Sequence, residues 1–407
     1  MPKTLDEFLS QMDSLDIGVG EVEGKRGVIL RPFQVEAYEN WVKNNYRGTI
    51  IAPTGTGKTI IAGYAIRKLN VPTLIVCPTE RILKMWIERL REKFGLSASA
   101  FYGGSKKIGR ITVTIYNTVS MIHPELLNNY DLIVLDEVHH AGSEVFSSII
   151  HRLSDGHKVM ALTATLKRED ERHMIIMSKL PVVYCLDLAT AIKHRLVAPV
   201  EVIPIGVDMN DRERREYTEI ERKISNVKNA LKTPSEDDEE RRRLERQLKI
   251  YINQRRILLS RLEAKKQAVH NIALRHPNER VLVFSESIDS IEALKKYLLE
   301  KGVKAETYHS NKPESIRDLI FKRWGTEFNV LLSCRALDEG IDVPECDIAV
   351  MIASGMSVRQ LVQRKGRIMR PREGKIAKLY VVYAYGSVEA KIPIKVKAIL
   401  SGIVKLY

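Results

Sequence analysis

The sequence lacks the features of several protein classes. Its four cysteines, Cys77, Cys185, Cys334 and Cys346, are scattered and form no Cys-x-x-Cys pair, which argues against a zinc ribbon and a disulfide framework. No apolar run approaches the roughly 20 residues of a transmembrane helix, and the first 16 residues have neither the basic nor the apolar region of a signal peptide. No PD-(D/E)xK nuclease signature stands out either. We therefore expect a soluble, cytoplasmic protein with no membrane partner.

Aromatic residues are few and positive charges are many. Aromatic residues make up 6% of the chain, so stacking platforms for single-stranded nucleic acid are not obvious. Lys and Arg exceed Asp and Glu by 65 to 51, a net charge of +14, which favours a polyanionic partner such as nucleic acid. With 407 residues and 44% hydrophobic content, the chain is long enough for two or three domains. Contacts to a phosphate backbone fit this composition better than base stacking.

A phosphate-binding loop is the first motif that carries chemistry. From residue 47 the chain reads RGTIIAPTGTGKTIIAGYAIRKL, which predicts a short strand, a glycine-bearing loop and a helix that begins at Lys58. In such a loop the backbone N–H groups surround the β-phosphate, the lysine reaches the β- and γ-phosphates, and the next hydroxyl ligates Mg²⁺. Ala52 stands where the usual first glycine would be. The candidate residues for binding ATP and, through the last of them, Mg²⁺ are Thr54, Gly55, Thr56, Gly57, Lys58 and Thr59.

Two acids and two histidines occur together in the stretch VLDEVHHAG. The apolar residues 132–135 predict a strand buried on both faces, so Asp136 and Glu137 lie at its carboxyl end, where open parallel sheets bind ligands. We expect Asp136 to ligate Mg²⁺, directly or through water, and Glu137 to be the base that orients the attacking water. The adjacent His139 and His140 point in different directions, which disfavours a zinc site. We interpret His139 as a sensor that hydrogen-bonds across the site and His140 as a structural or surface residue.

A second α/β unit is predicted after residue 275, because apolar strands alternate there with amphipathic segments. It contains no second P-loop. Its motif QLVQRKGRIMRP places Gln363, Arg367 and Arg370 at spacings of four and three, on one face of a helix. Arginines from a second lobe could stabilise the negative charge that spreads over the oxygens of a phosphoryl group during its transfer. The alternative is a solvated basic helix face.

Between the two units, residues 209–271 lose the strand pattern and predict two charged helices. Apolar residues recur at spacings of three and four in the first helix, at Tyr217, Ile220, Ile224, Val227 and Leu231. The apolar residues of the second helix are Leu244, Leu248, Tyr251, Leu258 and Leu262. These patterns predict a helical hairpin.

The ordered motifs APTGTGKT, DEVH, TAT, GIDVP and QRKGRIMR resemble those of superfamily 2 helicases over about residues 27–385. The resemblance implies an α/β fold with two RecA-like P-loop NTPase lobes, each a parallel sheet with flanking helices, which close on ATP. A nucleic-acid strand would lie across both lobes. Within LRPFQ the resemblance implies that Gln34 contacts adenine, and we assign Arg31 to the same nucleotide site.

The same resemblance gives roles to residues of the later motifs. It implies that His139, Thr163 and Thr165 couple hydrolysis to lobe movement. It further implies that Gly340 and Asp342 lie between the nucleotide and the nucleic-acid strand.

One short stretch narrows the resemblance. Directly after TAT the chain reads LKRED, and Arg168, Glu169 and Asp170 resemble the RED motif of XPB-type DNA repair helicases, although the tripeptide alone would be a charged turn. The predicted hairpin is similar to the thumb-like insertion of that family, which is thought to contact DNA there; the alternative is a solvated spacer. The expected domains are an N-terminal extension, a first lobe, a thumb-like insertion and a second lobe, at 1–26, 27–205, 206–274 and 275–407.

The sequence also departs from that family. Its members carry a damage-recognition domain ahead of the first lobe, whereas about 26 residues precede VILRPFQ here, too few for a domain. Archaeal XPB-like proteins, some of which work with a separate nuclease partner, are therefore the best comparison. XPD-like repair helicases are set aside, because their iron–sulfur cluster needs four clustered cysteines.

The resemblance implies an ATP-dependent DNA translocase or 3′→5′ helicase of nucleotide excision repair. The alternatives are the motor of a restriction system, an RNA helicase, and a nucleotide-gated module that presents DNA to a partner nuclease. Strand binding in such lobes relies mainly on contacts to the phosphate backbone. The candidate DNA-binding residues, each of which has an alternative as an ordinary loop or cap residue, are Pro78, Thr79, Arg81, Gly103, Gly104, Thr118, Arg168, Glu169 and Asp170.

Overall fold

The computed structural model describes residues 20–22, 25–121, 124–142, 147–164, 173–194, 196, 200–232, 238–285, 287–334, 346, 348–353 and 377–400. The chain divides near residue 197 into two compact units. Each unit has a parallel sheet and a hydrophobic core of its own. No helix in the described part of the chain is long and apolar enough to cross a lipid bilayer.

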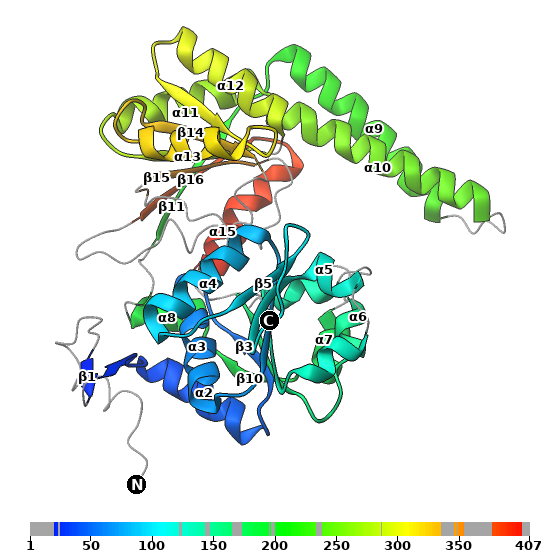
Figure 1. Cartoon of the computed structure of the whole chain (residues 1–407). Coiled ribbons are helices and arrows are strands. Elements are labelled where there is room, and N and C mark those ends of the chain that lie inside the picture. The colour runs from blue at the N-terminus through cyan, green and yellow to red at the C-terminus, as the bar shows by residue number, and fades with distance from the viewer. Residues whose placement is uncertain are drawn as a thin grey trace. The chain divides into compact units, whose positions relative to one another are not determined.

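The first unit is built on a sheet that has eight strands among the described residues (Figure 1). All neighbouring strands are parallel except the last pair, which is antiparallel. In spatial order the strands are β10 (Val182–Cys185), β3 (Arg47–Ile51), β9 (Lys158–Thr163), β8 (Leu132–Asp136), β4 (Thr73–Cys77), β7 (Ile111–Ile115), β5 (Ser99–Tyr102) and β6 (Ser105–Lys106). A short antiparallel pair comes earlier in the chain, formed by β1 (Gly20–Val22) and β2 (Lys25–Gly27).

Helices cover both faces of this sheet, so its central strands are buried along their whole length and consist mainly of apolar residues. On one face Trp41, Ile61 and Trp86 pack against the strands in one core. They come from α2 (Pro32–Lys43), α3 (Lys58–Leu69) and α4 (Glu80–Phe94). A second core contains Tyr116 and Ile176 on the other face. The elements there are α5 (Tyr116–Met121), η1 (Pro124–Asn129), η2 (Val138–Gly142), α6 (Ser147–His151) and α7 (His173–Lys179), and α8 (Leu188–Lys193) follows β10.

The second unit has a sheet in which the six described strands are all parallel. In spatial order they are β11 (Val200–Val207), β16 (Ala377–Ala384), β15 (Ile348–Ile352), β12 (Val281–Ser285), β14 (Val330–Cys334) and β13 (Ala305–Tyr308). Its helices outside the hairpin are α11 (Glu263–Arg275), α12 (Ile288–Glu300), α13 (Glu314–Arg323), η3 (Val388–Lys391) and α15 (Ile392–Leu400). The predicted α/β fold with two parallel-sheet units is thus confirmed.

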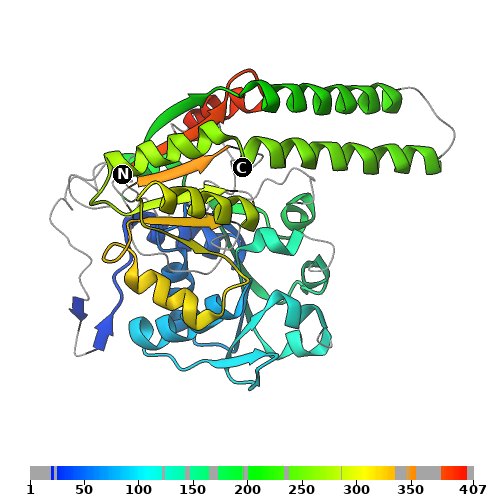
Figure 2. The same cartoon turned by 90° about the horizontal axis from the view of Figure 1, so that it is seen from above.

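A long helical hairpin belongs to the second unit. Its helices, α9 (Asp211–Lys232) and α10 (Asp238–Ser260), lie side by side and antiparallel (Figure 2). At its base Arg255 forms an ion pair with Glu221 at 2.7 Å, and the Tyr217 hydroxyl accepts a hydrogen bond from the Val388 N–H at 3.1 Å. Tyr217, Leu259 and neighbouring apolar side chains form a small core there. The hairpin is therefore anchored to the sheet of the second unit.

Two predicted domain boundaries need correction. The boundary at residue 205 falls inside β11, which pairs with β16 from Val200 to Val207 and so belongs to the second sheet. The hairpin is accordingly inserted after the first strand of the second unit, rather than between two complete lobes. The predicted end of the insertion at residue 274 is also wrong, because α11 packs Ala268, Val269 and Ile272 into the core of the second unit.

Candidate nucleotide-binding site

The P-loop of the first unit connects β3 to α3. Gly57 precedes the helix with a φ of 95°, and a Cβ at this position would approach the Gln34 amide nitrogen to 2.7 Å, so glycine is required. The buried Lys58 ammonium donates to the Ala52 carbonyl at 2.9 Å, and the Thr56 hydroxyl donates to the Pro53 carbonyl at 2.7 Å. The lysine that is predicted to bind phosphate thus lies inside its own loop. Of the remaining loop residues, Thr54 is half-buried and Gly55 is exposed.

Gln34 braces this loop. Its side-chain amide donates to the carbonyls of Thr56 and Gly57 at 3.2 and 3.3 Å and accepts from the Arg31 N–H at 2.9 Å. The predicted contact of Gln34 with adenine remains a prediction, while its observed contacts link α2 to the P-loop. Burial lowers the pKa of the Arg31 guanidinium. A cavity of about 210 Å³ lies on the same helix, lined among others by Pro32, Phe33, Glu36, Tyr184 and Asp187.

Asp136 ends β8 and is held from three sides. Its carboxylate accepts hydrogen bonds from the Trp86 indole N–H at 2.8 Å and from the Glu137 N–H at 3.0 Å, and its carbonyl accepts one from the Tyr116 hydroxyl at 2.9 Å. Burial, reinforced by the neighbouring Glu137 charge, raises the pKa of Asp136 to about 6, against the opposing effects of Trp86 and Lys58. A cation bound nearby would therefore stabilise the charged form of this carboxyl.

Glu137 and His139 follow directly. Glu137 adopts a positive φ of 48°, which turns the chain out of the strand and into η2. The His139 Nδ1 atom lies 3.1 Å from the Thr163 hydroxyl and 3.4 Å from the Glu137 carboxylate. Two of the three predicted coupling residues are therefore in contact, while Thr165 lies outside the described residues. The Glu137 Oε2 atom is buried and has no hydrogen-bond partner among the described residues. None of the described His, Cys, Asp and Glu side chains form a metal-binding group of three or more.

Thr59, the candidate Mg²⁺ ligand of the loop, also has a partner that the sequence did not reveal. Its hydroxyl accepts a hydrogen bond from the Arg89 guanidinium at 2.9 Å. Arg89 and Trp86 are three residues apart on α4, so they share a face of that helix. The sequence could show only this spacing, because nothing in it states which strands and helices the face would meet.

The pKa of Asp136 gives a pH prediction for the metal-free protein. Because this pKa is higher in the folded state than the ordinary 3.8, the contribution of Asp136 to folding is present at low pH and is lost as pH rises through about 6. The loss amounts to roughly 3 kcal/mol at 1.4 kcal/mol per pH unit. Asp136→Asn has no carboxyl to titrate and therefore does not suffer this loss. Its Tm should rise relative to that of the wild type between pH 4 and pH 7. Asp131→Asn, at an exposed residue directly before the same strand, provides the control; a pH-independent difference for Asp136→Asn would refute the prediction.

Comparison with known proteins extends this picture. Residues 27–168 match the family model of the type III restriction enzyme res subunit, and residues 264–372 match the helicase conserved C-terminal domain. A DNA 3'-5' translocase XPB2 of Sulfurisphaera tokodaii is 27% identical over 88% of this chain and 82% of its own length. A DNA 3'-5' helicase XPB of Mycobacterium tuberculosis is 28% identical over 90% of this chain and 63% of its own.

These matches support a superfamily 2 helicase of the XPB type. The crystal structure of the Pyrococcus furiosus Hef helicase domain is similar to this protein with a TM-score of 0.60 and 18% identity, over 90% of this chain and 98% of that one. At this identity the likeness concerns the fold alone, and it agrees with two RecA-like lobes.

The described candidates for DNA contact gather at one edge of the first sheet. Pro78 and Thr79 follow β4, Thr118 follows β7, and Gly103 and Gly104 form the exposed turn between β5 and β6. Because β4, β5 and β7 are parallel to β3 and β8, these positions lie at the same carboxyl edge as the P-loop. Thr79 is also the N-cap of α4, since its hydroxyl accepts from the Ile82 N–H at 3.3 Å. Arg81 is half-buried in the first turn of that helix.

Several predicted site residues lie outside the described residues, and their positions stay predictions. They are Arg168, Glu169 and Asp170 of RED, Gly340 and Asp342, and Gln363, Arg367 and Arg370.

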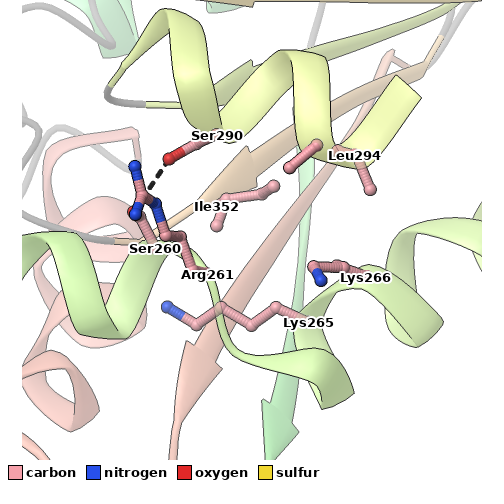
Figure 3. Close-up of a pocket in the computed structure, with 8 residues that line it drawn as sticks. Ser260, Arg261, Lys265, Lys266, Ser290, Leu294 and Ile352 are labelled. Carbon is pink, nitrogen blue, oxygen red and sulfur yellow. Dashed lines mark hydrogen bonds between the residues drawn. The ribbon is translucent and has the colours of Figure 1, made fainter. Parts of the chain in front are cut away.

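The second unit contains a small cavity of about 70 Å³ beside its sheet (Figure 3). The end of α10 contributes Ser260, whose hydroxyl lies 3.0 Å from that of Ser290 on α12. Lys265 of α11 and Ile352 at the end of β15 complete much of the wall. Lys265 is fully buried and forms an ion pair with Glu389 at 2.7 Å, so the wall of this cavity is built around an internal charge pair.

Proposed function

We propose that this chain hydrolyses ATP and uses the reaction to move along DNA in the 3′→5′ direction, or to open it, in DNA repair. One observation carries the proposal: the P-loop that contains Lys58 and the carboxylate of Asp136, from separate motifs, lie at the same carboxyl edge of the parallel first sheet. The names of the XPB relatives support the choice of DNA and the direction.

The residues present fit a magnesium-bound nucleotide. Thr59 and Asp136 offer oxygen donors, which Mg²⁺ prefers, and the buried Glu137 Oε2 atom has no hydrogen-bond partner among the described residues, as expected beside the place of a water. When bound, Mg²⁺ would neutralise charge on the phosphates. We propose that Lys58 exchanges the Ala52 carbonyl for phosphate oxygens and that Glu137 orients the attacking water and accepts its proton.

We place the base of ATP beside α2. Gln34 already contacts the P-loop. A base that forms a hydrogen bond with the Gln34 amide would therefore be linked through this side chain to the loop. The cavity lined by Pro32 and Phe33 borders the residues next to Gln34 and has a size that suits a purine ring. Arg31, at the N-cap of the same helix, would contribute to this site.

The later motifs complete the proposed cycle. Arg367 and Arg370, together with Gln363, would stabilise the charge on the transferring phosphoryl group. Gly340 and Asp342 would lie between nucleotide and DNA. His139, Thr163 and Thr165 would transmit hydrolysis to lobe movement, a role that the His139–Thr163 contact supports.

The DNA path is proposed on the carboxyl edge of the first sheet, with Pro78, Thr79, Gly103, Gly104 and Thr118 contacting phosphates through backbone and hydroxyl groups. Arg81 and the RED residues, Arg168, Glu169 and Asp170, would add side-chain contacts. The hairpin α9–α10 would add a further contact, because α9 and α10 are rich in Arg and Lys.

A partner nuclease is the remaining part of the proposal. The outer surface of α10 exposes Ile250 and Ile257, seven residues apart and therefore on one face of the helix, which suits contact with a protein. The chain would then act as a nucleotide-gated module that presents DNA to this partner. ATPase activity and DNA affinity without unwinding, with unwinding only after a nuclease is added, would favour this second function.

The test is the ATPase rate without nucleic acid and then with single-stranded DNA, duplex DNA, forked DNA and RNA at one salt concentration, because phosphate binding depends strongly on salt. We expect the strongest stimulation with forked DNA. Stimulation by RNA alone would favour an RNA helicase, and stimulation by nothing would remove the DNA-motor function while leaving the ATPase.

A further inference from the structure

One helix supplies a hydrogen-bond donor to each of the two candidate Mg²⁺ ligands. The Trp86 indole donates to the Asp136 Oδ2 atom at 2.8 Å, and the Arg89 guanidinium donates to the Thr59 hydroxyl at 2.9 Å. Trp86 and Asp136 are both buried, and Arg89 is half-buried. Both donors come from α4, whereas the ligands come from β8 and α3.

Packing fixes α4 firmly enough for these bonds to matter. Ile82, Leu83, Trp86, Leu90 and Phe94 form its buried face, and all belong to one core with the sheet. The Phe94 ring lies so close to α3 that a Cβ on Gly63 would approach it to 2.2 Å. Thr59 precedes Gly63 by one helical turn on the same face of α3, which brings its hydroxyl within reach of α4.

The two bonds orient the ligands without using all of their capacity. A carboxylate has about four lone-pair sites and a hydroxyl oxygen two. The Asp136 carboxylate accepts two hydrogen bonds, from Trp86 and the Glu137 N–H, so lone pairs remain for a metal or its water. Groups that orient metal ligands in this way usually change metal affinity by about 10–100-fold when they are removed.

The other end of α4 begins at Thr79, which caps the helix and stands among the proposed phosphate contacts. Trp86 lies about two turns further along the same rigid helix. A displacement of its first turn by a bound strand therefore moves the two donors with it.

We propose that Trp86 and Arg89 are positioning residues, through which α4 sets the orientation of Asp136 and Thr59 and passes the presence of DNA at Thr79 to the Mg²⁺ site. This inference rests on the proposed function, since it names the helix by which DNA regulates the same ATPase. Neither residue touches the reacting atoms; each acts through a ligand.

Trp86→Phe and Arg89→Met test the proposal. Trp86→Phe keeps an aromatic ring in the core and loses the N–H donor, and Arg89→Met removes the donor from a half-buried position where the risk to folding is lower. The readouts are the Mg²⁺ concentration that gives half-maximal binding of a fluorescent ADP analogue, the ratio of DNA-stimulated to basal ATPase, and Tm. We expect about tenfold more Mg²⁺ to be needed, unchanged binding of the analogue without Mg²⁺, and a stimulation ratio that falls towards one.

Two matched controls separate positioning from packing. Trp41→Phe removes another buried indole donor in the same unit. The Trp41 indole donates to the Val159 carbonyl at 2.8 Å, and this bond involves neither of the candidate Mg²⁺ ligands. Arg91→Met removes an exposed arginine of α4 itself. Both should leave the Mg²⁺ requirement and the stimulation ratio at the wild-type level, even if Trp41→Phe lowers Tm.

The proposal is overturned if Trp86→Phe and Arg89→Met shift neither the Mg²⁺ requirement nor the stimulation ratio beyond the controls. A shifted Mg²⁺ requirement with normal stimulation would overturn the link to DNA. Absence of ATPase stimulation in the wild type would instead count against the proposed function, and the nucleotide-binding readout would still decide whether α4 positions the metal ligands.

Discussion

Glu137→Gln is expected to lower kcat for ATP hydrolysis by roughly 10²–10⁴-fold, the usual contribution of a positioned general base. The substitution preserves the size of a side chain that sits on a turn of positive φ, with one carboxylate oxygen buried and 3.4 Å from His139. It removes the ability to accept a proton from water, together with the negative charge that helps to raise the pKa of Asp136. Binding of ATP should therefore stay within a few fold of wild type. Steady-state ATPase assays and titration with a fluorescent ATP analogue measure the two quantities.

Glu39→Gln provides the control, because Glu39 is an exposed residue on α2 of the same unit. It should retain wild-type kcat. If Glu137→Gln kept more than a tenth of the wild-type kcat, the base would have to be another residue. If it lost nucleotide binding as well, the defect would be structural.

Loss of the buried Lys265 charge is expected to have the largest effect on stability. The Lys265 ammonium donates to both carboxylate oxygens of Glu389, at 2.9 and 2.7 Å, and to the Ala353 carbonyl. Burial lowers the pKa of Lys265 and raises that of Glu389, and each partner opposes the effect on the other. Lys265→Met leaves the Glu389 carboxylate buried without its cation, so the unfolding free energy should fall by about 3–5 kcal/mol.

Two further variants make this prediction specific. The double variant Lys265→Met/Glu389→Gln should recover most of the loss, because the glutamine carbonyl can still accept from the Ala384 N–H, which now donates to Glu389 at 2.8 Å. Lys266→Met breaks the neighbouring pair with the largely exposed Glu263 and should change stability by less than about 1 kcal/mol. Denaturant unfolding measures all three. A double variant as unstable as Lys265→Met would show that packing, and not the unbalanced charge, is responsible.

The sequence predicted the secondary structure around Lys58 and Asp136, because its signals are local. A strand, a glycine loop and a helix in succession place Lys58 and Thr59 at the start of α3, after the loop that follows β3. The apolar run before Asp136 likewise predicts a strand buried on both faces, which β8 is. Parallel pairing then brings both ends to one edge of the sheet.

The sequence did not predict features that depend on distant partners. Val200–Val207 reads as a strand in either lobe, and only its pairing with Ala377–Ala384 assigns it to the second. Lys265 reads as one more charge in a charged segment, whereas its partner Glu389 lies 124 residues away. Trp86 reads as a core aromatic residue, and its indole bond to Asp136 depends on β4 lying beside β8.

The central claim is that ATP hydrolysis moves this chain along DNA, and displacement of a labelled third strand from duplex DNA tests it most directly. With Mg²⁺ and ATP the wild-type protein should displace the third strand. Displacement should be absent with a non-hydrolysable ATP analogue and in Glu137→Gln. Displacement that does not need hydrolysis, or DNA-stimulated hydrolysis without any displacement, would contradict the account.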